Sequence, residues 1–188
     1  MSMHGDPTHE EFVVLVDTDD RERGTMEKME AHRRGELHRA FSVFVFDDHG
    51  RVLLQQRADG KYHSAGLWTN ACCGHPRPGE GVEPAAARRA QEELGAALRP
   101  EWVFSFEYRT VFANGMHEHE LDHVFIALYN GPFAPHQDEV KDLRWCQPME
   151  LSAELDAHPA RFTVWLKECW HVVRDLAERK FSPRASRA

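Results

Sequence analysis

The sequence predicts a single domain of the α/β or α+β class, built as a sandwich. Strand-rich segments come first, a helix follows near the middle, a second strand-rich part comes next, and helices end the chain. Neither an internal repeat nor an interdomain linker interrupts this order. The length of 188 residues, with 41% hydrophobic and 29% charged residues, suits one core. We therefore expect one domain over residues 1–188, with loose termini at about 1–9 and 182–188.

Six strands are predicted from runs of β-branched and aromatic residues that end at turn signals. An acidic turn follows the first run, and the sequence Asp-Asp-His-Gly joins the next two as a hairpin. Two long aromatic runs are joined through Asn114-Gly115 and a His/Glu segment, which indicates paired strands. The predicted strands are 11–17, 41–46, 51–57, 101–112, 121–129 and 140–146.

Four helices are predicted from capping residues, helix formers and apolar spacing. Thr25 is expected to cap the first, in which Lys28 and His32 lie one turn apart and so share a side. Alanines favour the second helix, and Gly95 ends it. The last has apolar residues at three- and four-residue intervals. The predicted helices are 26–34, 83–94, 148–155 and 162–180.

Charge and cysteine content exclude several classes of protein. A formal net charge of -8 argues against sequence-independent binding to nucleic acid or anionic membranes, because both need clustered Lys and Arg. The chain has neither an apolar run of about eighteen residues nor a signal segment, so we expect a cytoplasmic protein that does not bind membranes. The cysteines are Cys72, Cys73, Cys146 and Cys169. Two neighbours make a poor disulfide framework, so we expect thiols.

The densest chemistry lies in residues 69–96, where a loop feeds a helix rich in glutamate. Its spacing is Gly74, five residues, Glu80, seven residues, Arg88-Arg89-Ala90-Gln91-Glu92-Glu93, then Gly95-Ala96. This spacing resembles the Nudix box, whose glutamates hold divalent cations against a diphosphate. The resemblance implies a mixed β-sheet sandwiched between helices. The chain departs from the pattern at Arg89, where the box has a glutamate.

An ordered set of short motifs narrows the resemblance. Cys73-Gly74-His75-Pro76 follows Trp68-Thr69-Asn70, with Ala31-His32 and Leu37-His38 upstream and residues 114–120 downstream. From about residue 28 to residue 165 the chain resembles type 1 isopentenyl diphosphate isomerase. The resemblance implies interconversion of isopentenyl and dimethylallyl diphosphate by protonation and deprotonation, in isoprenoid biosynthesis. The expected partner is such a small-molecule diphosphate, bound to a monomer.

Paired carboxylates suggest a metal site. Glu118 and Glu120 are two apart in an extended segment, so they project to one face. They repel unless a cation or a shared proton lies between them, although a solvated hairpin edge is the ordinary alternative. Imidazoles at His32, His38 and His75 would complete a mixed nitrogen and oxygen shell for Mn²⁺, Mg²⁺ or Zn²⁺. The resemblance assigns these five residues to one metal.

Moving a double bond requires that one carbon gains a proton and another loses one. An acid and a base must therefore lie on opposite faces of the five-carbon chain. The resemblance implies Cys73 on one side and Glu120 on the other, assisted by Tyr108. Trp165 would offer an indole face to a passing carbocation. For Cys73 and Trp165 alone, a small buried filler and a core aromatic are the ordinary alternatives.

The diphosphate needs partners of its own. Glu93 would hold a second cation, Mg²⁺ arriving with the substrate. Arg89 repels a cation and attracts phosphate, which suits holding a diphosphate intact rather than attacking it with metal-activated water. Arg88 and Glu92, four apart, are expected to pair within the helix. The basic positions that can contact phosphate oxygens are Lys28, Arg57, Lys61 and Arg89, each of which is alternatively a solvated charge.

Two other functions remain open from the sequence. A Nudix hydrolase of nucleoside or other diphosphates needs a full carboxylate cluster on the box helix, which Arg89 breaks. A catalytically silent diphosphate-binding module would be stabilised by ligand without turning it over.

Overall fold

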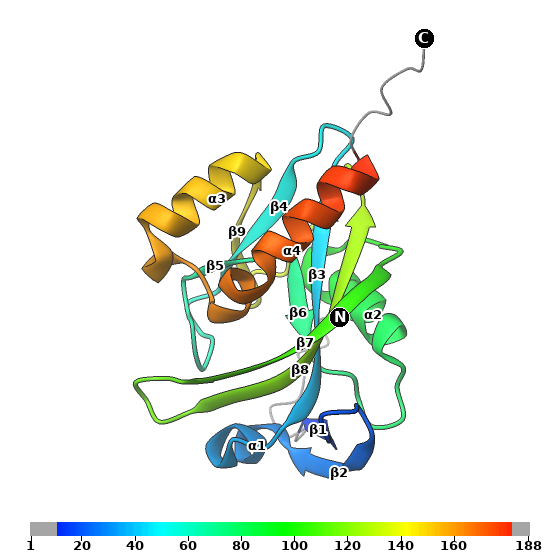
Figure 1. Ribbon diagram of the computed structural model, residues 1–188, viewed down its shortest axis with the longest axis vertical. Helices are drawn as coiled ribbons and strands as arrows, with labels where there is room; N and C mark the ends of the chain where they lie inside the picture. The colour runs from blue at the N-terminus through cyan, green and yellow to red at the C-terminus, as the bar shows by residue number, and fades with distance from the viewer. Residues whose placement is uncertain (1–10, 182–188) are drawn as a thin grey trace, which may run out of the picture.

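Within the described residues, 11–181, nine strands form one mixed sheet with helices on both faces (Figure 1). The termini expected to be loose lie outside this range in the computed structural model. The strands are β1 (Phe12–Val16), β2 (Glu22–Glu27), β3 (His38–Phe46), β4 (Val52–Arg57), β5 (Trp68–Thr69), β6 (Cys72–Gly74), β7 (Glu101–Val111), β8 (His117–Leu128) and β9 (Val140–Cys146). The helices are α1 (Lys28–Arg34), α2 (Val82–Leu94), α3 (Pro148–Ala157) and α4 (Val164–Phe181), with a 3-10 turn at Pro159–Arg161.

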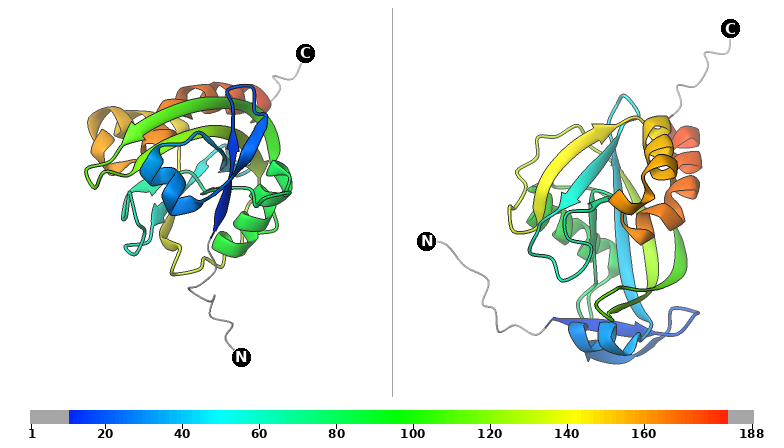
Figure 2. Two further views of the ribbon diagram at one scale, coloured as in Figure 1. Left: turned by 90° about the horizontal axis from the view of Figure 1, so that it is seen from below. Right: turned by 90° about the vertical axis from the view of Figure 1, so that its left-hand side faces the viewer.

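The central strand β3 explains the two-sided core. It runs parallel to β8 and antiparallel to β1, β4 and β6. Because side chains alternate along a strand, Phe41, Val43 and Val45 pack toward α2. Phe44 and Phe46 pack on the opposite face, in the core that includes the buried side of α4. Figure 2 shows helices on both sides of the sheet, so the predicted sandwich is confirmed.

Helix α2 lies close to the sheet because its buried side is made of small residues. Ala85, Ala86 and Ala90 are fully buried against β3. Gly74 likewise lets the backbone of β6 lie close to the Phe41 ring of β3, since a Cβ there would lie 2.9 Å from Phe41 Cζ. Gly95 ends the helix with φ of 63°, as expected.

The first predicted helix is wrong at its start. Thr25 does not cap it but pairs with Val14 in the β1–β2 ladder. Glu27 is the cap, and its carboxylate accepts the backbone N–H groups of Met29 and Glu30 at 2.8 Å each. Strand β2 was missed because pairing with β1, a tertiary contact, outweighs the local helical signal of residues 24–26.

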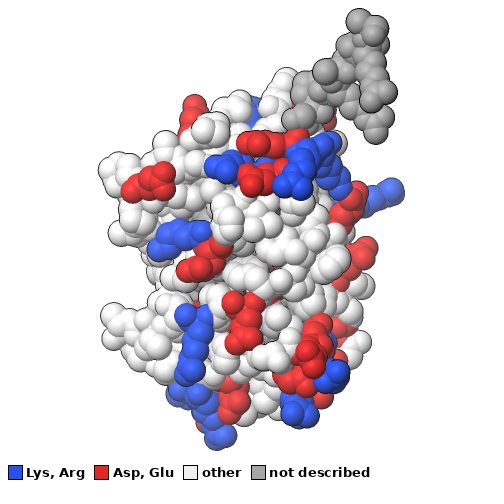
Figure 3. Space-filling view, in the orientation of Figure 1, with Lys and Arg blue, Asp and Glu red and all other residues white. Residues whose placement is uncertain are grey.

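The surface carries mixed charge. On the face drawn in Figure 3, Lys and Arg side chains lie beside Asp and Glu side chains. All four cysteines are free thiols, as expected. Among residues 11–181, no helix is both long and apolar enough to cross a membrane.

Candidate active site

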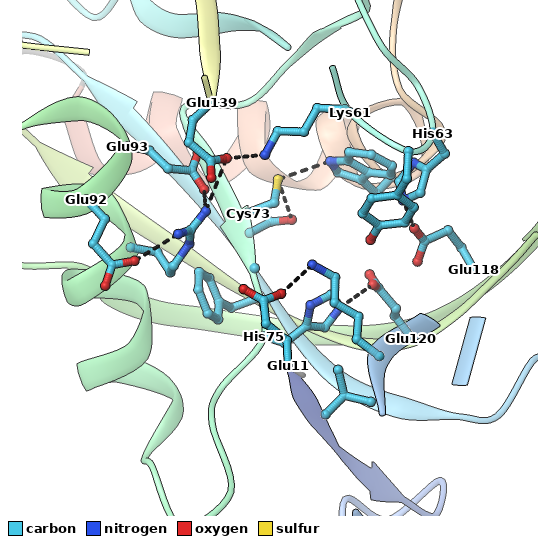
Figure 4. Close-up of a pocket in the computed structure, with 18 of the residues that line it drawn as sticks. Glu11, Lys61, His63, Cys73, His75, Glu92, Glu93, Glu118, Glu120 and Glu139 are labelled. Atoms are coloured by element: carbon cyan, nitrogen blue, oxygen red, sulfur yellow. Dashed lines mark hydrogen bonds and ion pairs between the residues drawn. The ribbon is translucent and has the colours of Figure 1, made fainter. Parts of the chain in front are cut away.

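A cavity of about 800 Å³ brings the predicted site residues together (Figure 4). It opens between α2, the sheet and the loop of residues 58–67, and the first turn of α4 closes one side with Trp165. The predicted residues that line it are Lys28, Arg57, Lys61, Cys73, His75, Arg89, Glu93, Tyr108, Glu118, Glu120 and Trp165. The remaining two, His32 and His38, are buried and form a group with His75.

Strand register builds one end of the cavity. His38 of β3 lies opposite Glu120 of the parallel strand β8, and Tyr108 of β7 lies opposite Glu120 on its other side. Three polar side chains therefore form one row across three strands. Ser42, four residues further along β3 than His38, is the register partner of Cys73 in β6. The alternation of β8 also puts Glu118 on the same face as Glu120.

Glu120 has three polar neighbours. Tyr108 donates its hydroxyl to Glu120 Oε2 at 2.6 Å. His75 Nε2 lies 2.8 Å from Glu120 Oε1, and His38 Nε2 lies 3.5 Å from the same oxygen. Burial alone would raise the pKa of Glu120, but these two histidines outweigh burial and hold that pKa well below its ordinary value.

The pKa of Glu118 is shifted in the opposite direction. Burial and the nearby charge of Glu120 raise the pKa of Glu118 well above its ordinary value. His63 Nε2 lies 2.5 Å from Glu118 Oε1, and His32 Nδ1 lies 3.8 Å from Glu118 Oε2. Burial and then the neighbouring histidines lower the pKa of His32 to about 3, so its imidazole is neutral at neutral pH.

The residues at this end fit a divalent cation. We call His32, His38, His75, Glu118 and Glu120 the His/Glu cluster. Within it, ligand atoms of the three histidines lie within 4.8 Å of one another, and so do those of His38, Glu118 and Glu120. His38 Nε2 and Glu118 Oε2 are buried atoms with no hydrogen-bond partner among residues 11–181. Imidazoles beside carboxylates form the donor set that Mn²⁺, Zn²⁺ or Mg²⁺ accepts.

Cys73 lies on another wall of the cavity. Its S–H donates to Asn70 Oδ1 at 3.2 Å, and Trp165 Nε1 donates to the sulfur at 3.1 Å. Burial raises the pKa of Cys73 to about 12, so the thiol is protonated at neutral pH. The sulfur is therefore an oriented proton carrier rather than a resting thiolate.

Beside Cys73, a buried carboxyl lies on β8. Ser42 donates its hydroxyl to Asp122 Oδ2 at 2.7 Å, and the same hydroxyl lies 3.8 Å from the Cys73 sulfur. Burial, and then the charge of Glu120, raise the pKa of Asp122 to about 8. Ser42 and Asp122 thus line the sulfur with polar atoms that the sequence patterns did not single out.

The other end of the cavity is built on α2. We call Lys61, Arg89, Glu93 and Glu139 the α2 cluster. Arg89 pairs closely with Glu93 and lies 3.4 Å from Glu139, which in turn pairs closely with Lys61. Gln55 donates to Glu93 Oε2 at 3.1 Å. Burial raises the pKa of Glu93, although Arg89 opposes that effect.

Lys28 and Arg57 border the space between the two clusters. Lys28 pairs with Glu11 at 2.7 Å, and its Nζ lies 5.1 Å from the centroid of the Tyr62 ring. Arg57 lies over the Trp165 ring, 5.4 Å from its centroid. Both cations therefore face the cavity from elements far from α2.

The loop-helix frame is held by its own ion pairs. Arg88 donates to both oxygens of Glu80, at 2.7 and 2.8 Å, and pairs with Glu92 at 3.1 Å. The expected pairing of Arg88 with Glu92 is confirmed. These bonds fix the loop before α2 and so hold the end that carries His75.

Sequence reasoning missed several residues of the cavity. His32 Nδ1 donates to the His117 carbonyl oxygen, so its Nε2 accepts the Tyr62 hydroxyl at 3.2 Å, and His63 contacts Glu118. Their only sequence signal was their position next to Lys61. Glu139, just before β9, and Glu11, just before β1, sit in ordinary polar stretches that carry no motif. Only the fold brings them to Lys61 and Lys28.

The chain resembles curated isomerases along most of its length. It is 48% identical over 160 residues to "Isopentenyl-diphosphate Delta-isomerase 2" of Aromatoleum aromaticum, covering 85% of each chain. It is 51% identical over 156 residues to the enzyme of Burkholderia multivorans, covering 83% of this chain and 89% of the relative. The Nocardia farcinica relative is 49% identical over 177 residues, covering 93% and 99%.

The fold and the family model agree with these relatives. A Deinococcus radiodurans crystal structure superposes with a TM-score of 0.73 at 20% identity, covering 86% of this chain and 98% of the other, which shows the fold. A MutT NUDIX hydrolase of Burkholderia pseudomallei superposes at 0.58 with 26% identity, covering 72% and 96%. The NUDIX domain model matches residues 36–166. The chain therefore belongs to the isopentenyl-diphosphate Delta-isomerase family, type 1, within the NUDIX superfamily.

Proposed function

We propose that the protein interconverts isopentenyl diphosphate and dimethylallyl diphosphate. The observation that carries the proposal is that Cys73 and Glu120 line one cavity, in opposite ionisation states. The sulfur keeps its proton because burial raises the pKa of Cys73, whereas the histidines keep Glu120 ionised. One proton donor and one proton acceptor are thus available at the same site.

The proton balance requires such a pair. Isomerisation adds a proton to the terminal carbon and removes one from the carbon next to the oxygen-bearing one, so the net number of protons is unchanged. One group gives its proton while the other receives one, and the pair is reset before the next turnover in the same direction. Tyr108, 2.6 Å from Glu120, can pass a proton between that carboxylate and the hydrocarbon chain.

The walls between the acid and the base suit a cationic intermediate. Trp165 is 4% exposed, and its indole N–H points at the Cys73 sulfur. An aromatic wall stabilises positive charge by about 1–2 kcal/mol and leaves less room for water, which would capture a carbocation. We assign Trp165 the role of stabilising that charge.

The His/Glu cluster would hold one divalent cation, through His32, His38, His75, Glu118 and Glu120. A cation bound there supplies positive charge that fixes the position and ionisation of Glu120. His75 and His38 orient that carboxylate whether or not it is a ligand. We propose Mn²⁺, Zn²⁺ or Mg²⁺ at this position.

The α2 cluster would hold the diphosphate. Lys61 and Arg89 would exchange their bonds to Glu139 and Glu93 for bonds to phosphate oxygens, with Lys28 and Arg57 on the opposite side. Glu93, relieved of Arg89, would then bind Mg²⁺ brought by the substrate. The guanidinium at position 89 leaves α2 one carboxylate short of the hydrolase pattern, which favours a diphosphate that stays intact.

Incubation with isopentenyl diphosphate and Mg²⁺ plus Mn²⁺ tests the proposal. Dimethylallyl diphosphate is the expected product, and in D₂O it carries deuterium. Release of inorganic phosphate or of a monophosphate ester would instead indicate a Nudix hydrolase. Ligand-induced stabilisation without any product would indicate a binding module.

Cys73→Ala tests the assignment of the acid. Loss of a positioned acid or base lowers kcat by about 10²–10⁴-fold. Cys146→Ala is the matched control, because Cys146 is a buried thiol at the end of β9, away from the cavity. Undiminished turnover in Cys73→Ala would refute the mechanism.

A further inference from the structure

The loop of residues 58–67 carries a histidine, His63, to which none of the roles above applies. The side chain is 8% exposed and lines the cavity. Its ring stacks on Phe112, beside the β7–β8 turn, with centroids 4.7 Å apart and an interplanar angle of 12°. The ring meets Trp165 edge-on at 5.9 Å. Two aromatic residues from distant parts of the chain thus hold this imidazole in one plane.

Both ring nitrogens of His63 have a partner. Nε2 lies 2.5 Å from Glu118 Oε1, and Nδ1 lies 3.2 Å from Ser64 Oγ. Ser64 has a φ of 52°, which a residue other than glycine adopts at a cost. Arg57 Nη2 donates to the His63 carbonyl oxygen at 3.2 Å. The loop therefore accepts backbone strain in the segment that brings His63 to Glu118.

The position of the His63 ring proton at these two contacts follows from what a metal ligand requires. Glu118 must be ionised to bind a cation, and an ionised carboxylate only accepts hydrogen bonds. His63 must then carry its proton on Nε2, and Nδ1 accepts the hydroxyl of Ser64. Nε2 is thereby occupied by Glu118, so His63 is not itself a ligand in this arrangement.

Fixing one oxygen of Glu118 aims the other. Oε2 has no hydrogen-bond partner within residues 11–181, and it lies 3.8 Å from His32 Nδ1. Glu118 also offers a ligand atom within 4.8 Å of those of His38 and Glu120. Without a donor on Oε1, the carboxylate can rotate and withdraw Oε2 from this group.

We propose that His63 is a positioning residue of the cation site, which holds Glu118 by one oxygen so that the carboxylate faces the other ligands. The inference rests on the proposed cation site in the His/Glu cluster and extends it to a residue outside the cluster. Supporting groups of this kind change metal affinity by about 10–100-fold when they are removed.

The experiment is a titration of Mn²⁺ into the full-length protein without substrate, followed by electron paramagnetic resonance. His63→Ala is expected to weaken Mn²⁺ binding by about 10–100-fold. His63→Gln keeps a side-chain N–H donor and is expected to recover most of the affinity. His171→Ala, an exposed histidine on α4, is the matched control and is expected to bind as the wild type does.

Turnover separates positioning from direct catalysis. In His63→Ala the Mn²⁺ concentration for half-maximal rate should rise, while kcat at saturating Mn²⁺ stays within about threefold of the wild type, since substituting a group that acts through the metal changes affinity. A low kcat that added Mn²⁺ does not restore would overturn the positioning role. Wild-type Mn²⁺ affinity in His63→Ala would overturn the inference as well.

A second variant covers the case in which His63→Ala does not fold. Ser64→Gly tolerates the positive φ and removes the hydroxyl that fixes the His63 tautomer. Mn²⁺ binding several-fold weaker than in the wild type supports the inference, and unchanged binding contradicts it. If the wild-type protein itself binds no Mn²⁺ without substrate, the proposed cation site is wrong, and the inference is wrong with it. This outcome differs from the one in which only the role of His63 is wrong, because there the wild type does bind Mn²⁺.

Discussion

The two ends of the cavity are both buried and rich in carboxylates, but their charges are balanced in different ways. In the α2 cluster, Lys61 and Arg89 already neutralise Glu93 and Glu139. In the His/Glu cluster the imidazole of His32 is neutral, and two atoms, His38 Nε2 and Glu118 Oε2, have no hydrogen bond among the described residues. The side chains at one end balance one another's charges, whereas those at the other form a donor set that suits a cation.

The difference indicates an order of binding. A cation can enter the His/Glu cluster on its own, because His38 Nε2 and Glu118 Oε2 have no hydrogen bond within residues 11–181 to give up. A cation at Glu93 has to displace Arg89, which is unfavourable until a diphosphate accepts that guanidinium. The metal in the first cluster is thus expected to be resident, and the metal at the second to arrive with the substrate.

The largest effect is expected from Glu120→Gln. This change removes the proposed proton carrier and a proposed metal ligand together, so kcat should fall by about 10²–10⁴-fold. Glutamine keeps the size of the side chain, and circular dichroism checks that the variant is folded. Mn²⁺ binding without substrate should weaken in the same variant. Normal Mn²⁺ binding in Glu120→Gln would contradict a resident metal in the His/Glu cluster.

Metal removal and return give the next largest effect. A cation at about 100 times its Kd stabilises a folded protein by about 2.7 kcal/mol, or roughly 5–10 °C in Tm for a chain of this size. After EDTA treatment, Mn²⁺ alone should restore this stability in the wild type and in Glu93→Gln. In Glu118→Gln the shift should be much reduced. An equal loss in Glu93→Gln would mean that both ends bind metal without substrate.

Glu93→Gln should affect the substrate rather than the resident metal. KM for isopentenyl diphosphate is expected to rise about tenfold, which corresponds to about 1.4 kcal/mol. The Mg²⁺ concentration needed for half-maximal rate should rise with it. Glu83→Gln is the control on the same helix, because Glu83 is exposed in the first turn of α2 and does not line the cavity. Unchanged KM in Glu93→Gln would show that the substrate-borne cation binds elsewhere.

The smallest effect concerns acid stability. Burial alone would raise the pKa of Glu139, but Lys61 and Arg89 outweigh it and lower that pKa below its ordinary value of 4.5. The ion pairs therefore stabilise the protein above pH 4.5, and this contribution is lost as pH falls through the folded-state pKa. Glu139→Gln should lower the free energy of unfolding by about 1 kcal/mol at pH 7, and the difference should vanish in acid.

An ion pair outside the cavity provides the control for that prediction. Glu154 accepts hydrogen bonds from Arg144 Nη1 and Nη2, at 2.8 and 2.7 Å. These bonds lower the pKa of Glu154, as the ion pairs of Glu139 lower the pKa of Glu139. Glu154→Gln should lose a similar acid-sensitive contribution. Only Glu139→Gln should increase the Tm shift caused by inorganic diphosphate, because it frees Lys61 and Arg89 for phosphate. Equal shifts in both variants would contradict the exchange of partners.

The site was predicted unevenly, and the unevenness has a physical cause. Residues in fixed local frames, such as Cys73 and His75 or Glu118 and Glu120, were found because backbone geometry sets their relative positions over two residues. The start of the first helix was misplaced because Thr25 and Met26 pair with strand β1, and this pairing outweighs their local helical signal. Tyr62, His63, Asp122 and Glu139 were missed because each acts through a contact with a residue far away in the sequence.

By itself the sequence determined the fold class, the box helix and the chemical groups of the cavity, because apolar periodicity, glycine positions and motif spacing are local properties of the chain. Only the tertiary structure decided their ionisation and pairing. The thiol of Cys73 is protonated, Glu120 is ionised and Arg89 is bound to Glu93 because burial and distant neighbours set each pKa and each partner. Those quantities depend on which strands lie side by side, and that follows from packing the whole sheet.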